Sequence, residues 1–328
     1  MRHNLSRSRP PIPLYMSISG AASHNLRICS VSSALRLPPI QSRVSSQLRI
    51  VQLSDLHYAP GPDVDLGLEL ARGIVDRLDP DLIIVSGDLT QQGLFEQFGP
   101  VVDFLTSLGL DRVRAIPGNR DYLAGGPGPT RPPDSDLDYF LTAPDTMLEQ
   151  NSAERRRATP FLDFFDDVDF FERTKEACIV GLDSEPVIPD DALHRAIAYF
   201  EGTSSRLTRI FCTHRSLMPV PGKKLKEGDI LPNAGDILQQ LLDARVDLVL
   251  CAHLHRVHFW QLEHDNHVMA VVNAPSLLDR SPGKAVGLIS YDIEQRGRIR
   301  AEFHTLGDIP SRVLVDTSDR RRGKKRSA

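Results

Sequence analysis

The stretch VQLSDLH, residues 51–57, joins a short apolar run to two polar residues, Asp55 and His57. An apolar run of this kind predicts a buried strand, and the Asp-x-His that ends it supplies a carboxylate and an imidazole, two common metal ligands. In α/β folds, ligands bind at the carboxyl ends of the strands. Asp-x-His alone is a weak motif that occurs in many chains. Its meaning therefore depends on the motifs that accompany it later in the chain.

Further polar motifs close strand-like apolar runs after residue 57. In order, they are Gly87-Asp88, Gly118-Asn119-Arg120-Asp121, His214, and His253-Leu254-His255. Parallel strands would deliver all these side chains to the same rim of a sheet. Histidine, aspartate and asparagine are ligands that suit Mn2+, Fe and Zn2+. The order of the motifs thus indicates a metal site assembled from several strand ends.

Strand and helix patterns alternate from residue 48 onward. The run at 81–88 is continuously apolar, which is typical of a central strand covered on both faces. Asn233 is expected to cap the helix that comes after it, and four apolar segments after residue 255 predict antiparallel strands. The alternation predicts a layered α/β domain. The expected strands are 48–55, 81–88, 112–121, 177–184, 209–214 and 246–255, then 256–263, 267–274, 286–293 and 298–304; the expected helices are 64–78, 95–108, 190–200 and 234–244.

Together these motifs resemble those of the calcineurin-like metallophosphoesterase superfamily, across residues 48–304. The segments around residues 51, 87 and 214–255 look most like its small prokaryotic members, here with a Gly-Asn-Arg-Asp variant of the third motif. The resemblance implies a layered α-β-β-α sandwich with a dimetal site at the carboxyl ends of the strands. By the same resemblance, Asp55, His57 and His255 would hold one metal, Asn119, His214 and His253 the other, and Asp88 would bridge them.

The resemblance also implies an activity. Two divalent cations, Mn2+, Fe or Zn2+, would lower the pKa of a bridging water toward about 7. The resulting hydroxide would attack the phosphorus of a phosphodiester or a pyrophosphate. We therefore expect a dimetal-dependent phosphohydrolase. Asp88, Asn119, Arg120 and Asp121 are its expected catalytic residues, and Arg120, Lys223 and Lys224 its expected substrate-binding residues.

Two positions depart from the superfamily pattern. Arg120 stands where most members have a histidine that, with the aspartate corresponding to Asp121, protonates the leaving group. Arginine stays charged and cannot act as an acid, but it can clamp a phosphate with two hydrogen bonds. This predicts a leaving group that needs little protonation, and the same variant occurs in the generally shorter UDP-diacylglucosamine pyrophosphohydrolases. Ala252 replaces a glycine and adds one methyl group to the last turn.

Charge divides the chain into an acidic body and two basic ends. The first 47 residues hold six arginines and no acid, and the last ten hold six basic residues against one acid, although the net charge is −4. Residues 1–47 predict a disordered basic extension rich in Arg and Ser; an organelle transit peptide, or a start placed before the true one at Met16, fits equally. We expect a phosphoesterase domain at 48–308, with an insertion or lid at 122–160, and a basic tail at 309–328.

The composition also bears on partners and location. An acidic body argues against a nucleic-acid groove, because such a groove needs a basic face. No apolar run reaches the roughly 18 residues of a membrane span. The four cysteines form no C-x-x-C pair, which predicts a reduced, cytoplasmic protein. We expect it to act on a small-molecule or lipid-precursor phosphate. The alternatives are a cyclic-nucleotide phosphodiesterase and a non-catalytic scaffold with the same fold.

Overall fold

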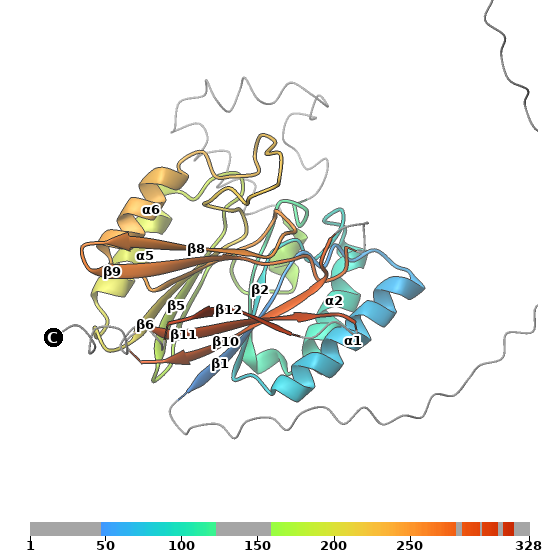
Figure 1. Cartoon of the computed structure of the whole chain (residues 1–328). Coiled ribbons are helices and arrows are strands. Elements are labelled where there is room, and N and C mark those ends of the chain that lie inside the picture. Colours follow the sequence, from blue (N-terminus) through green and yellow to red (C-terminus); the bar gives the residue numbers. More distant parts are fainter. Residues whose placement is uncertain (1–46, 123–158, 280–283, 296, 308–310, 318–328) are drawn as a thin grey trace, which may run out of the picture. The chain divides into compact units, whose positions relative to one another are not determined.

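The computed structural model of the chain describes residues 47–122, 159–279, 284–295, 297–307 and 311–317, all within the second of two units of the chain, residues 40–328 (Figure 1). Two six-stranded sheets form the centre of this part of the chain. The first has the order β12-β11-β10-β1-β2-β3, with β1 (Leu48–Leu53), β2 (Leu82–Ser86), β3 (Val113–Ile116), β10 (Gly287–Glu294), β11 (Arg298–Thr305) and β12 (Arg312–Asp316). The second has the order β4-β5-β6-β7-β9-β8, with β4 (Phe170–Arg173), β5 (Ala177–Leu182), β6 (Thr208–Thr213), β7 (Leu248–Cys251), β8 (His258–His264) and β9 (His267–Asn273).

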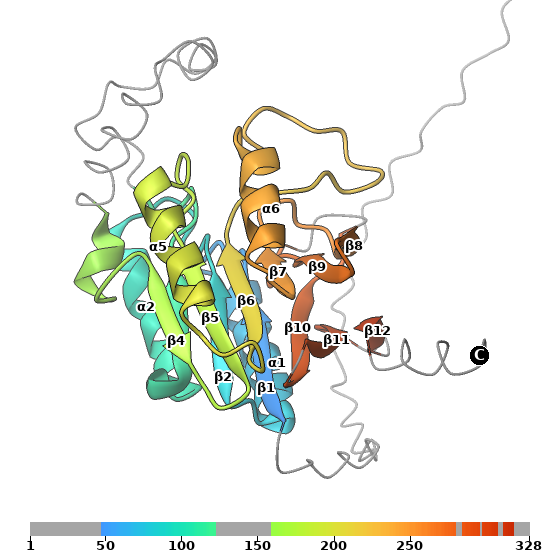
Figure 2. The same cartoon turned by 90° about the vertical axis from the view of Figure 1, so that its left-hand side faces the viewer.

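Helices cover the outer face of each sheet (Figure 2). Side chains of α1 and α2 pack on the first sheet, as Ile74 and Phe98 pack with Val85, and those of α5 and α6 pack on the second. A third apolar core lies between the sheets. The layers therefore run helix, sheet, sheet, helix, which confirms the predicted α-β-β-α sandwich. The bounds are α1 (Pro62–Leu78), α2 (Phe95–Ser107), α5 (Asp190–Glu201) and α6 (Ala234–Asp243), with short 3-10 turns η1 (Leu110–Arg112) and η2 (Pro160–Asp163).

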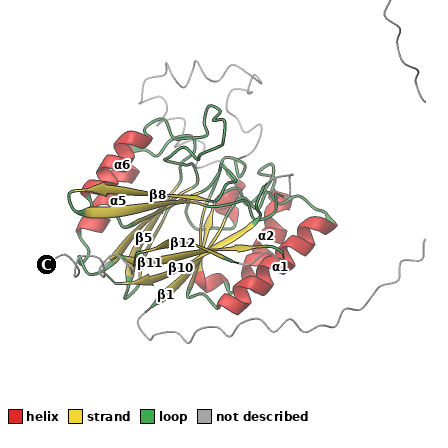
Figure 3. Ribbon diagram, in the orientation of Figure 1, coloured by secondary structure: helices red, strands yellow, loops and turns green. Residues whose placement is uncertain are grey.

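The two covered faces explain the continuous apolar runs of the central strands (Figure 3). Successive side chains of a strand point to opposite faces. In β1, Ile50 belongs to the core between the sheets, whereas Val51 belongs to the core beneath the helices. All five residues of β2 are buried in the same way. These parallel strands end at one rim, and their carboxyl ends carry the motifs found in the sequence.

The cap of α6 differs from the prediction. Asn233 stands at the N-cap position, but its side chain makes no capping hydrogen bond, and its Oδ1 is buried without a partner among the described residues. A capping side chain needs an extended backbone to reach back over the first turn. Asn233 instead has φ −96° and ψ 22°. Asn233 is therefore the N-cap residue of α6, as expected, but its side chain does not cap the helix.

The strands of the C-terminal part are divided between the two sheets. β8 and β9 form the expected antiparallel pair, but β9 also pairs in parallel with β7. β10 crosses to the first sheet, where it lies antiparallel to both β1 and β11. β12 pairs with β11 and falls within the segment 309–328, so the sheet continues past the expected boundary at residue 308.

Several expectations concern residues outside the described ranges. They include almost all of the predicted extension at 1–47, most of the predicted insertion at 122–160, and the basic end of the tail after residue 317. Within the ranges described, none of the helices has the length and apolar character needed to cross a membrane.

Candidate metal centre

The ends of several strands bring the predicted ligands together. Their donor atoms form two groups, each with its atoms within 4.8 Å of one another. We call the first cluster 1 and the second cluster 2. Cluster 1 consists of Asp55, His57 and His255, which follow β1 and β7. Cluster 2 consists of Asp88, His214 and His253, which follow β2, β6 and β7.

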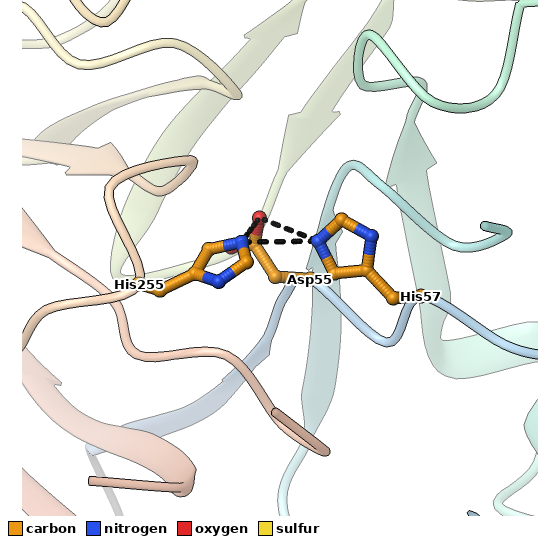
Figure 4. A group of neighbouring side chains, drawn as sticks. All are labelled: Asp55, His57 and His255. Atoms are coloured by element: carbon orange, nitrogen blue, oxygen red, sulfur yellow. Dashed lines mark hydrogen bonds and ion pairs between the residues drawn. The ribbon is translucent and has the colours of Figure 1, made fainter. Parts of the chain in front are cut away.

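In cluster 1, two imidazoles point their nitrogens at one carboxylate oxygen (Figure 4). His255 Nε2 lies 3.1 Å from Asp55 Oδ1, and His57 Nε2 lies 3.7 Å from the same oxygen. The two Nε2 atoms are 3.0 Å apart. Asp55 Oδ1 is buried and makes no hydrogen bond within the described residues. Two imidazole nitrogens that converge on an unsatisfied buried oxygen fit a cation, which would bind all three atoms.

Cluster 2 is built around the fully buried His214. Its Nδ1 lies 2.8 Å from the carbonyl oxygen of Ser86, which can only accept, so Nδ1 carries a proton and Nε2 is the nitrogen that faces the cluster. Around Nε2 lie Asp88 Oδ1 at 3.4 Å and His253 Nδ1 at 3.3 Å. Asn119 Oδ1, also 3.3 Å from Nε2, adds the amide oxygen that the sequence predicted beside this cluster.

Asp88 lies between the clusters. Its Oδ1 faces His214, while its Oδ2 lies 3.5 Å from His57 Nε2 in cluster 1. The backbone N–H of Arg120 donates to Oδ1 at 2.7 Å and fixes the carboxylate from the β3 side. One oxygen toward each cluster is the orientation that a bridging ligand requires.

The pKa values show that the site holds negative charge and accommodates positive charge. Burial raises the pKa of Asp55, but His255 and His57 together lower it well below the usual value, so this carboxyl is ionised. Burial lowers the pKa of His214, yet the Asp88 carboxylate raises it to about 10. Burial, with His214 beside it, lowers the pKa of His253 to about 3. Without a metal, His214 therefore carries a proton on both ring nitrogens while His253 is neutral, and a bound cation would displace the extra proton from His214 Nε2.

Most of the candidate ligands have an unusual backbone conformation. Residues other than glycine rarely adopt positive φ, and such conformations concentrate at functional sites. The left-handed conformation occurs at the candidate ligands that follow β1 and β2 and at both histidines that follow β7. Their φ values are 50° at Asp55, 46° at His57, 53° at Asp88, 66° at His253 and 51° at His255.

Two glycines allow the turns after β2 and β3 to approach His214 closely. A Cβ on Gly118 would lie 2.3 Å from the backbone N of Asp88 and 2.8 Å from His214 Nε2. A Cβ on Gly87, which has φ +91°, would lie 2.5 Å from His214 Nδ1. Ala252, in contrast, keeps its methyl group: it is buried, and its N–H donates to the His214 carbonyl oxygen at 2.9 Å. This departure from the family pattern is accommodated.

The remaining predicted site residues occupy different surroundings. Asp121 is buried and accepts hydrogen bonds from the N–H groups of Leu89, Thr90 and Gly118 and from the Thr90 hydroxyl. Burial, followed by the nearby Asp88 charge, raises the pKa of Asp121 to about 6. Arg120 is exposed at the rim beside Asn119.

Of the two lysines, only Lys223 is held near the ligands. Its Nζ lies 3.4 Å from the carbonyl oxygen of Leu254, between the two histidines of the last motif, and 3.6 Å from Asp229 Oδ2. Lys224 is exposed.

Two carboxylates behind the ligand histidines were missed in the sequence. Asp279 Oδ2 lies 2.9 Å from His255 Nδ1, and Asp229 Oδ1 lies 3.8 Å from His253 Nε2. Both belong to loops that are 24 residues away along the chain from the histidine they face. No local pattern in the sequence could have identified them; only the tertiary fold brings them to the site.

Comparison with known proteins places these features in context. A protein-family model described as calcineurin-like phosphoesterase matches residues 48–257. The structure is similar to purple acid phosphatase PPD1 from yellow lupin seeds (TM-score 0.59, 14% identity, covering 84% of this chain and 55% of that one). It is also similar to GAP50, the anchor in the inner membrane complex of Plasmodium (TM-score 0.53, 14% identity, covering 83% and 90%). No curated protein sequence matched the chain.

Proposed function

Because the chain belongs to the calcineurin-like phosphoesterase family, we propose that it is a dimetal-dependent phosphohydrolase that cleaves a phosphodiester or pyrophosphate bond. One observation carries this proposal. Two clusters of converging donors lie on either side of Asp88, which turns one oxygen toward each. This is the ligand set that two neighbouring divalent cations require.

The ligands have defined roles in the proposal. Asp55, His57 and His255 hold one ion, His214, His253 and Asn119 hold the other, and Asp88 bridges them. When bound, such ions polarise the phosphate and lower the pKa of a water molecule. The Ser86 carbonyl accepts the proton on His214 Nδ1, so that Nε2 is the nitrogen that would bind the ion. Mn2+, Fe and Zn2+ all suit these donors.

Arg120 supports a choice of bond. Its backbone N–H donates to Asp88 Oδ1, and this exposed residue directly follows Asn119 at the rim of the site. There it binds phosphate oxygens with paired N–H donors and neutralises charge that develops on them. It cannot give a proton to a leaving group. The oxygens of Asp121 are engaged by four donors, so Asp121 acts by holding the turns in place.

The substrate class is inferred from this lack of a proton donor. A phosphate leaving a pyrophosphate, or an activated alcohol leaving a diester, departs without protonation more readily than a simple alkoxide. We therefore infer a small-molecule or lipid-precursor pyrophosphate or diester as substrate. Cyclic nucleotides, whose cleavage releases a sugar alkoxide, rank below them. Comparing hydrolysis of cyclic AMP with that of a UDP-sugar separates these two classes.

The three described cysteines bear on location. Cys178, Cys212 and Cys251 are free and buried. Free thiols in a folded core are typical of a reducing compartment. We therefore propose a cytoplasmic enzyme.

The decisive experiment compares bis(p-nitrophenyl) phosphate with p-nitrophenyl phosphate. Metal-stripped protein is assayed with and without Mn2+, beside Asp88→Ala. We expect Mn2+-dependent cleavage, faster with the diester, and its loss in Asp88→Ala. Folded wild-type protein that binds no metal and cleaves neither compound would overturn the proposed function. A preference for the monoester would overturn the choice of bond while leaving the metal-dependent activity in place.

A further inference from the structure

A turn after β9, residues 276–279, is fastened to the end of β1 that carries Asp55. Ser276 Oγ donates to the carbonyl oxygen of Asp55 at 2.6 Å, and Leu277 N donates to the carbonyl oxygen of Ser54 at 2.8 Å. Asp279 N in turn donates to Ser276 Oγ at 3.0 Å. The turn lies beyond residue 257, where the match to the family model ends. The turn thus connects the backbone of Asp55 to Asp279, whose side chain contacts His255.

That side chain is Asp279. Its Oδ2 lies 2.9 Å from His255 Nδ1, and a carboxylate only accepts, so Nδ1 carries the proton and Nε2 presents its lone pair to cluster 1. Lys284 Nζ donates to the same Oδ2 and lies 3.4 Å from His255 Nδ1. Two donors therefore share one oxygen atom. The positive charge of this half-exposed lysine partly neutralises the Asp279 carboxylate, which weakens the attraction between that carboxylate and the His255 imidazole.

The other histidine of the motif lacks an equivalent contact. His253 Nε2 lies 3.8 Å from Asp229 Oδ1, beyond hydrogen-bond distance. Asp229 Oδ2 instead accepts from the backbone N–H of Lys226 at 2.8 Å. His57 Nδ1 is buried and has no hydrogen-bond partner among the described residues. Within the described structure, Asp279 thus makes the one direct carboxylate-to-imidazole contact behind the histidines of the two clusters.

We propose that Asp279 is a positioning residue that strengthens divalent-cation binding at cluster 1, and that Lys284 opposes it, so that the pair sets the affinity of this cluster. The proposal rests on the metal site of the proposed function. A carboxylate behind a ligand histidine fixes the tautomer and ring orientation and makes the free nitrogen a better donor. A cation that shares the carboxylate weakens this effect and also repels the bound ion.

Opposite effects of two substitutions are therefore expected. Asp279→Asn keeps an acceptor for His255 but removes the charge, and outer partners of this kind typically change metal affinity by about 10- to 100-fold. We expect a loss of that size at one of the two ion sites. Lys284→Met removes the competing cation, and we expect the same site to bind several-fold more tightly. A purely structural role for the turn would give no gain in affinity in any variant.

The test is calorimetric titration of Mn2+ into the metal-stripped full chain. It compares wild type, Asp279→Asn, Lys284→Met and Lys284→Arg, with Lys175→Met as the matched control. Lys175 is an exposed lysine between β4 and β5, at the opposite rim of the sheets. Lys284→Arg keeps the charge and should bind like wild type, as should Lys175→Met. Thermal melts of the metal-free proteins check folding.

The outcomes separate the two proposals. A weaker site in Asp279→Asn and a tighter one in Lys284→Met support the inference. If wild type binds two ions and both variants bind them with wild-type affinity, the inference is wrong, but the proposed function is unaffected. The same holds if both variants lose affinity. Wild type that binds no Mn2+ overturns the metal site itself. If Asp279→Asn fails to fold, the exposed Lys284→Met decides alone, because only the inference predicts a gain.

Discussion

The two clusters hold similar donors by different means. In cluster 2, the side chains of Asp88 and His214 are 2% and 0% exposed, and Gly87 and Gly118 pack against them without room for a Cβ. In cluster 1, the side chains of His57 and His255 are 16% and 17% exposed, and a hydrogen-bonded turn holds His255 from behind. Asp55 of cluster 1 is fully buried and His253 of cluster 2 is 17% exposed, so the contrast concerns the other two members of each cluster. Close packing adds to the hydrogen bonds that hold Asp88 and His214, whereas His255 depends on hydrogen bonds and charge.

This difference predicts which kind of substitution should weaken each cluster. A close-packed site responds to added volume, because backbone atoms cannot move aside without moving the ligands they carry. A site held by hydrogen bonds responds to the loss of a charge or a proton acceptor. Asp279→Asn and Lys284→Met test the hydrogen bonds and charge behind cluster 1. The substitutions below test the packing of cluster 2 and the contacts of the segments that support it.

Gly118→Ala should have the largest effect. The new Cβ would lie 2.3 Å from Asp88 N and 2.4 Å from Asp88 Oδ1, so the Asp88 carboxylate must shift. A displacement of about 1 Å at a catalytic site can lower the rate about 100-fold or more. We expect diester hydrolysis to fall by at least that factor and cluster 2 to lose its ion, measured by kinetics and metal content.

The matched control is Gly73→Ala in α1, where a Cβ would meet nothing within 4 Å. Alanine favours a helix over glycine by up to about 1 kcal/mol, so this variant should be active and no less stable. If Gly118→Ala keeps two ions and wild-type kinetics, packing does not determine cluster 2.

Arg215→Met should have the next largest effect. Arg215 follows His214, and its Nε and Nη2 each donate to a Glu185 carboxylate oxygen at 2.8 Å. Its Nη1 donates to the carbonyl oxygen of Gly228, beside the Asp229 that faces His253. Removing one partner of a buried ion pair costs about 3–5 kcal/mol. Urea unfolding should show a loss of that order.

The double variant Arg215→Met with Glu185→Met serves as its control. It leaves no unpaired charge and should recover a large part of the lost free energy of unfolding. A double variant no more stable than Arg215→Met would mean that the contact with Gly228, and not the buried charge, holds the loop.

The sequence indicated the residues that the fold brings together in the two clusters, but not the carboxylates behind them, for a physical reason. Asp55, Asp88 and His214 each follow an apolar strand directly, so a local pattern reports their position, and parallel strands bring such positions together. The same reasoning predicted the layers and helices. Asp279 reaches His255 across a hairpin and a turn, and Asp229 approaches His253 from a loop with no periodic pattern. Their roles arise from tertiary contacts alone.

Two further features could not be read from the local sequence. Asn233 has the residue type of a cap, but its backbone is not extended. β9 and β10 have similar apolar patterns and yet enter different sheets, because pairing partners far along the chain decide which edge each strand joins.

Asp121→Asn should have a moderate effect, on stability more than on binding. The Asp121 carboxylate accepts from Thr90 N at 2.8 Å and from Gly118 N at 2.9 Å, and so joins the turns after β2 and β3. An asparagine would set its NH2 group against at least one N–H donor. An unsatisfied buried group costs about 1–3 kcal/mol. We expect a loss of that size in urea unfolding, accompanied by slower hydrolysis.

Asp167→Asn is the matched control. Asp167 accepts a local hydrogen bond from Val168 N at 2.7 Å, outside the site. It should remain active and within about 0.5 kcal/mol of wild type. Comparable losses in both variants would mean that Asp121 has no special part in joining the turns.

Lys223→Met should have the smallest effect. Comparison with Lys224→Met tests whether the position of Lys223, and not only its charge, matters. Lys223 Nζ lies 3.4 Å from the carbonyl oxygen of Leu254, between the histidines that face the two clusters, whereas Lys224 is exposed. A partly screened charge near an anionic substrate contributes up to about 1 kcal/mol, or roughly fivefold in binding. We expect KM for a pyrophosphate to rise by about that factor in Lys223→Met and to stay unchanged in Lys224→Met. Added salt should narrow the gap between Lys223→Met and wild type, because ions screen the lost attraction. Equal effects of the two substitutions would assign the attraction to the general charge of the loop, and the predicted pair of substrate-binding lysines would then act only through long-range charge.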